Sequence, residues 1–272
     1  MINPEHSHME LRAFTFSHFL KTYNIETEDR AIFHIGCATG ALSAELAEKA
    51  SRVHGFDQRE YLINFAKNEY LNLKNIGFEY CPSLIFNFPR ICNLALIDFA
   101  TIDCYDTTNE HKKELFECIN QHLSHNGEMF ISITTTDNVL HPNIITAVNM
   151  APTIQEIVPD ITEENIIELA TPPYPSLQEL LTMLEETGFE VMTSEEQTIT
   201  TEISTDNLYD IYADIVTKNP LFECVQDPDS KIMLGVQFIQ KYIDVLEMNN
   251  EGNLLEPTIT TIIHARKIKN IS

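Results

Sequence analysis

Apolar and polar residues alternate along the first half of the chain in a pattern that predicts short buried strands separated by helices. Apolar runs suited to strands lie at residues 31–35, 52–57, 77–80, 93–99 and 128–134. Between them, the helix-prone or helically spaced segments are 41–50, 60–71 and 111–123. We expect five strands with four intervening helices in this part of the sequence, and these three segments are the clearest of the four. That alternation is typical of a doubly wound α/β sheet.

The first strand runs directly into a glycine-containing turn. The turn reads Gly36-Cys37-Ala38-Thr39-Gly40 and ends where a helix-prone segment begins. Glycine allows a close approach to the backbone, and the start of a helix offers unpaired N–H groups. Asp57 ends the second strand, where a carboxylate can accept hydrogen bonds from both hydroxyls of a ribose. Together these features predict half of a nucleotide-binding fold.

This turn resembles motif I of the class I S-adenosylmethionine-dependent methyltransferases, in which an acid and an apolar residue precede G-x-G-x-G. His34 stands where the family has the acid, and Ala38 stands where it has the middle glycine. The spacing differs from the G-x-G-x-x-G that holds the pyrophosphate of a dinucleotide. The resemblance therefore favours S-adenosylmethionine over a dinucleotide as the cofactor.

The second half of the chain extends the resemblance. Residues 175–188 predict a capped amphipathic helix, and 189–193 a sixth strand. Residues 258–266 resemble the seventh strand of these enzymes, which lies antiparallel between the fifth and the sixth. Helix-like stretches at 206–216 and 233–246 resemble the cover of the trans-aconitate and juvenile-hormone-acid methyltransferase group.

The expected architecture is a Rossmann-like, doubly wound, seven-stranded and mostly parallel sheet with an antiparallel last strand and a helical cover. We expect residues 1–272 to form a single methyltransferase domain. Within it, residues 1–29 would form an N-terminal helical segment, and residues 196–257 a helical cover inserted between strands six and seven.

The resemblance also implies roles for individual residues. The backbone of the glycine turn would pass beneath the methionine portion of the cofactor, Asp57 would bind the ribose, and Gln58 would lie beside the adenosine. Ser83 and the backbone of Leu84 follow the third strand, where the family often has an acid for the adenine. Asp98 and Phe99 end the fourth strand, where the family lines the site of methyl transfer. The predicted cofactor-binding residues are Gly36, Cys37, Ala38, Gly40, Asp57, Gln58, Ser83, Leu84, Asp98 and Phe99.

The sequence identifies no catalytic residue. A carboxylate acceptor needs no general base because it is already ionised, whereas a hydroxyl or an amine acceptor would use one. His18, His111 and His141 are the best-placed histidines, and each fits a surface or packing role. We expect a small-molecule substrate and no metal ion.

Charge and composition narrow the class of partner. The chain has 17 Lys and Arg against 41 Asp and Glu, a formal net charge of −24. Such a surface disfavours nucleic acids and anionic lipids as partners. The sequence has no apolar run of membrane-spanning length, and its N-terminus does not resemble a secretory signal. The six cysteines have no C-x-x-C spacing, so we expect reduced thiols and a cytoplasmic protein.

Two alternatives remain open at the level of the sequence. Acids that the family has before motif I and after the third strand are absent, so the chain could be a degenerate methyltransferase fold that acts as a binding or interaction module. An NAD-dependent oxidoreductase would share the ribose-binding acid. We rank it last because the glycine spacing is unsuited to a pyrophosphate.

Overall fold

The computed structural model describes residues 25–99, 108–135, 142–171, 175–203 and 220–270, which divide into two compact units. The sheet unit comprises described residues 25–99, 108–135, 175–197 and 259–270. The helical unit comprises described residues 142–171, 198–203 and 220–258.

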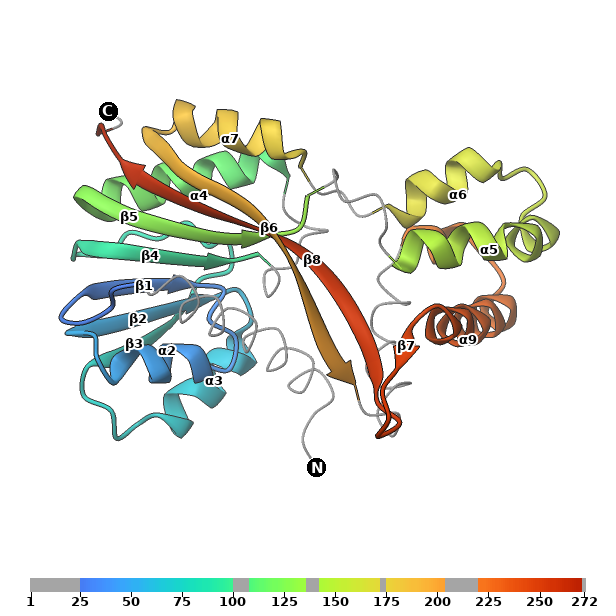
Figure 1. Ribbon diagram of the computed structural model, residues 1–272, viewed down its shortest axis with the longest axis horizontal. Helices are drawn as coiled ribbons and strands as arrows, with labels where there is room; N and C mark the ends of the chain where they lie inside the picture. The colour runs from blue at the N-terminus through green and yellow to red at the C-terminus, as the bar shows by residue number, and fades with distance from the viewer. Residues whose placement is uncertain (1–24, 100–107, 136–141, 172–174, 204–219, 271–272) are drawn as a thin grey trace. The chain divides into compact units, whose positions relative to one another are not determined.

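The sheet has the predicted topology (Figure 1). Its seven main strands are β1 (Ala31–Ile35), β2 (Arg52–Asp57), β3 (Ile76–Tyr80), β4 (Cys92–Asp98), β5 (Leu123–Ile133), β6 (Phe189–Ile203) and β8 (Leu254–Lys267). They are ordered β3-β2-β1-β4-β5-β8-β6, and the two-residue β7 (Glu247–Met248) pairs with β8. Neighbouring strands from β3 to β5 are parallel, and β8 is antiparallel to β5. The expected mostly parallel, Rossmann-like sheet with an antiparallel last strand is confirmed.

Helices cover both faces of this sheet. In Figure 1, α2 (Ala41–Ala47) and α3 (Glu60–Glu69) lie on one face, and α4 (Asn109–His122) and α7 (Leu177–Glu186) on the other. Alternate side chains of β1 pack on the two faces of the sheet, because successive residues of a strand point in opposite directions. Phe33 and Ile35 belong to the core under α4 and α7, whereas Ile32 packs with residues of α2.

One of the four expected helices is absent, because β3 and β4 are joined by an irregular segment over residues 81–91. The expectation of four helices among the first five strands is therefore wrong. Leu84 lies there in a left-handed backbone conformation (φ 55°), which a helix does not tolerate. The segment contributes aromatic rings to the core instead. Phe86 stacks on Phe56 with ring centroids 4.2 Å apart, and Phe88 packs edge-on against Phe33 at 5.5 Å.

The helical unit has a core of its own. Its helices are α5 (Pro142–Ile157), α6 (Glu163–Ala170), the short 3-10 helix η2 (Pro220–Cys224) and α9 (Pro228–Asp244). α9 contains most of the predicted helix 233–246, whereas α5 and α6 were not predicted. The predicted stretch 206–216 and most of the N-terminal segment 1–29 lie outside the described residues.

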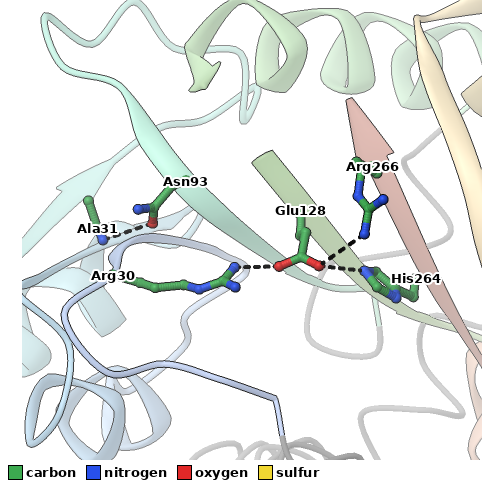
Figure 2. A network of polar contacts seen from close by, with 6 residues as sticks. All are labelled: Arg30, Ala31, Asn93, Glu128, His264 and Arg266. Carbon is green, nitrogen blue, oxygen red and sulfur yellow. Dashed lines mark hydrogen bonds and ion pairs between the residues drawn. The ribbon is translucent and has the colours of Figure 1, made fainter. Parts of the chain in front are cut away.

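A polar network joins β5 and β8 to Arg30, the residue that precedes β1 (Figure 2). Arg30 Nη1 donates to Glu128 Oε2 at 2.5 Å, and His264 Nε2 lies 3.3 Å from Glu128 Oε1. Arg266 Nη2 lies 3.9 Å from the same oxygen. Burial favours a protonated Glu128, but the hydrogen bond and charge of Arg30 outweigh it, so the pKa of Glu128 is lowered.

Candidate functional site

The predicted site residues collect at the opposite edge of the sheet, where the parallel strands end. Ile35, the last residue of β1, pairs with Phe56 of β2 and with Ile97 of β4. Gly36 therefore follows on between Asp57 and Asp98. The strand order changes direction between β1 and β4, and α/β proteins bind ligands at such a point.

The ten residues differ in how far they are buried at this edge. Cys37, Ala38, Asp57, Asp98 and Phe99 are buried, whereas Gln58 is partly exposed and Ser83 is exposed. The side chain of Leu84 belongs to the hydrophobic core. The structure thus brings the ten residues to one edge of the sheet, and their contacts with a cofactor remain a prediction.

The glycine turn is fixed to the neighbouring strand by its own amides. Gly36 and Cys37 both donate their N–H groups to the carbonyl of Phe56, at 2.8 and 3.1 Å. Gly36 and Gly40 have φ angles of 77° and 82°, which glycine adopts without strain. Gly40 is also closely packed, since a Cβ there would lie 2.7 Å from the ring of Phe78.

The carboxylate of Asp57 accepts four hydrogen bonds at this edge. Its Oδ2 accepts hydrogen bonds from the amide of Ala38 at 2.8 Å and from Nη2 of Arg59 at 2.9 Å. Its Oδ1 accepts from the amide of Arg59 at 2.9 Å and from Nε of Arg59 at 2.8 Å. The guanidinium of Arg59 is therefore bidentate on a carboxylate that is only 1% exposed.

His34, which replaces the family's acid, is buried on the α2 face of β1. Its Nδ1 is 2.8 Å from the hydroxyl of Ser43, while its Nε2 has no hydrogen-bond partner within the described residues. Burial lowers the pKa of His34 to about 4, although the charge of Asp57 acts in the other direction. The ring is therefore neutral at pH 7.

Comparison with known proteins identifies the family. The model of a methyltransferase domain matches residues 26–188, more than half of the chain. The chain belongs to the methyltransferase domain family. A search of curated protein sequences finds no match.

Solved structures support the same fold for this methyltransferase domain. The YcgJ protein of Bacillus subtilis is 12% identical with a TM-score of 0.55, over 93% of this chain and 97% of that one. The MccD protein is 18% identical with a TM-score of 0.52, over 93% and 96% of the two chains. The magnesium protoporphyrin IX methyltransferase of Synechocystis PCC 6803, solved with bound SAH, is 11% identical with a TM-score of 0.50, over 94% and 81%. At these identities the likeness concerns the fold.

The edge fits a nucleoside cofactor in part. The unpaired Nε2 of His34 lies two residues before the glycine turn, and a buried nitrogen without a partner suits a polar group of a ligand. Asp57 is the residue that the sequence resemblance predicts to bind the ribose. The carboxylate is, however, already satisfied by this chain's own donors.

Two residues that contact Asp57 and His34 at this edge were not predicted from the sequence. Arg59 is a clamp on Asp57, and its position two residues after a strand-ending acid was the available signal. Ser43 contacts His34 from α2, and no pattern in the sequence indicated that contact.

Of the three candidate histidines, the structure describes one. The ring of His111 lies with Nε2 2.6 Å from the carbonyl of Ser83, so it joins α4 to the segment after β3. His18 and His141 lie outside the described residues.

The described part of the chain contains no cluster of three His, Cys, Asp or Glu side chains suited to a metal ion. None of its helices is both long enough and apolar enough to span a membrane. Its cysteines Cys37, Cys81, Cys92, Cys118 and Cys224 are free thiols, and all except Cys224 are buried.

Proposed function

We propose that this methyltransferase domain binds S-adenosylmethionine and transfers its methyl group to a small molecule, with a carboxylate as the first candidate acceptor. The observation that carries the proposal is the position of the Gly36–Gly40 turn between Asp57 and Asp98 at the carboxyl edge of the sheet. The cofactor-binding residues named from the sequence, the cytoplasmic location and the likeness to the trans-aconitate group belong to the same proposal.

Methyl transfer from this cofactor to a carboxylate needs no side chain that acts as an acid, a base or a nucleophile. The sulfonium of the cofactor, when bound, supplies an activated methyl group. The protein aligns the nucleophile with the carbon–sulfur bond and excludes water. An ionised carboxylate requires no base, so the proposal needs no catalytic side chain beyond those that bind and orient the two reactants.

A second candidate is a binding or interaction module with the same fold. Two observations favour it: the carboxylate of Asp57 is occupied by Arg59, and a neutral histidine stands in place of the motif I acid.

Thermal unfolding with added ligands separates the two candidates. S-adenosylmethionine and its demethylated product SAH should each raise the melting temperature, because a ligand that binds only the folded state stabilises it. NAD should produce no shift, as a dinucleotide control. If neither S-adenosylmethionine nor SAH changes the melting temperature at millimolar concentration, the proposal of an active methyltransferase is wrong, and the binding module is the remaining candidate. Release of SAH with a panel of carboxylic acids and phenols then identifies the acceptor.

A further inference from the structure

The four acceptor positions of the Asp57 carboxylate are filled by four donors of two kinds. Two donors are backbone amides, those of Ala38 at 2.8 Å and Arg59 at 2.9 Å. The other two are side-chain groups of Arg59, Nε at 2.8 Å and Nη2 at 2.9 Å. A carboxylate offers about four lone-pair positions, so no further donor can be accommodated.

The two kinds of donor differ in whether a ligand can displace them. The amide of Ala38 belongs to a turn that is tied to β2, and the amide of Arg59 lies at the N-terminal boundary of α3. Moving either amide would disrupt the turn or the helix. The guanidinium is carried by a long side chain that is 18% exposed, whereas the side chain of Asp57 is 1% exposed. Arg59 is therefore the more exposed member of the pair.

A ribose with vicinal hydroxyls donates two hydrogen bonds, the same number that the guanidinium supplies. We propose that Arg59 is an internal competitor of the ribose and sets the affinity of the site for the nucleoside cofactor. The guanidinium must leave Asp57 before both hydroxyls can bind there. This inference rests on the proposed function, because it concerns the same nucleoside site.

The positive charge of Arg59 is kept in the pair with Asp57. Burial opposes the charge of Arg59, but its hydrogen bonds to Asp57 and the charge of that residue outweigh burial and raise the pKa of the guanidinium. The guanidinium therefore stays charged at neutral pH. The pairing is bidentate and charge-assisted, so its release costs affinity.

The experiment measures SAH binding by calorimetry to the wild type and to Arg59→Met, which keeps most of the aliphatic stem. We expect the variant to bind about tenfold more tightly, since about 1.4 kcal/mol corresponds to one decade. Arg59→Lys keeps the positive charge but cannot donate two parallel hydrogen bonds, so its affinity for SAH should lie between those of the wild type and Arg59→Met. The matched control Arg52→Met removes an arginine at the first residue of β2, the strand that ends at Asp57, and should leave the affinity unchanged.

The SAH analogue that lacks both ribose hydroxyls makes the test specific. The gain in affinity should be lost with this analogue, because it has no diol to occupy the released carboxylate. An unchanged or weaker affinity of Arg59→Met for SAH, beside a wild type that binds, would overturn the proposal and leave the proposed function intact. The same gain for both ligands would also overturn it. If neither wild type nor variants bind SAH, the proposed function fails and this inference with it. Binding by the variant alone supports both.

Unfolding temperatures without ligand verify that each variant is folded. If Arg59→Met does not fold, Arg59→Lys decides the question through the same comparison of the two ligands.

Discussion

Two buried side chains at the carboxyl edge of the sheet have protonation states that depend on burial more than on neighbouring charge. His34 is 2% exposed, and its pKa is lowered to about 4 although Asp57 is close enough to favour the proton. The cysteine of the glycine turn follows the same rule. Burial and the charge of Asp57 both raise the pKa of Cys37, so its thiol stays protonated and unreactive. Neither side chain adds charge beside the Asp57–Arg59 pair.

The buried imidazole of His34 predicts a specific loss of stability in mild acid. In the unfolded chain this histidine takes up a proton near its ordinary pKa of 6.5, and in the folded chain it does so only near pH 4. The free energy of unfolding should therefore fall as the pH drops through this window. Between pH 7 and pH 5 the wild type should lose about 2 kcal/mol more than His34→Gln.

Denaturant unfolding at both pH values measures this difference, and comparison of the two proteins cancels the titration of groups that they share. His125→Gln removes an exposed histidine and controls for the loss of an imidazole as such. Equal pH dependence in wild type and His34→Gln would show that His34 takes up its proton equally in the folded and unfolded chains.

Individual elements were predictable where their buried side chains follow a regular period. β1, β2 and β4 are buried on both faces and appear in the sequence as apolar runs. β6 was expected to end at residue 193 but continues to Ile203. The added residues were not predicted as strand because they are mainly polar and show no alternation of apolar and polar positions. α5 was missed because Pro152, within the helix, is ordinarily a helix breaker.

At the candidate site, residues were predictable from their position along a strand, whereas the contacts between their side chains were not. Asp57 was assigned from its place at the end of a strand, which is a local property. Its occupation by Arg59 and the contact of His34 with Ser43 depend on side-chain conformations that the sequence pattern does not specify.

The polar network around Glu128 predicts that one carboxylate supports the junction of three elements. Glu128 of β5 holds Arg30, which precedes β1, and contacts His264 and Arg266 of β8 (Figure 2). Glu128→Gln should lower the free energy of unfolding by about 1–2 kcal/mol, since it leaves a partly buried arginine without its charged partner. Chemical denaturation checks this value against Glu185→Gln, an exposed acid of α7.

The effect of Glu128→Gln should depend on pH in a known direction. The pKa of Glu128 is lowered in the folded protein, so its stabilising contribution is complete above the unfolded value near 4.5 and is lost as the pH falls through the folded value. Wild type and variant should therefore converge in acid. If the free energies of unfolding of the two proteins still differ after the carboxylate is protonated, the effect of Glu128→Gln comes from packing and not from charge.

At the scale of the whole molecule, the net charge of −24 acts on any charged ligand that approaches it. S-adenosylmethionine carries one more positive charge than SAH because of its sulfonium, while the rest of the two molecules is the same. The field of the protein should therefore accelerate the association of S-adenosylmethionine and leave that of SAH almost unaffected.

Salt screens such a field, with a Debye length near 10 Å at about 0.1 M ionic strength. Stopped-flow association rates measured from about 20 to 500 mM NaCl should fall for S-adenosylmethionine and remain nearly constant for SAH. Parallel falls for the two ligands would mean that salt acts on the site itself, for instance on the Asp57–Arg59 pair, and that the overall charge does not steer the cofactor.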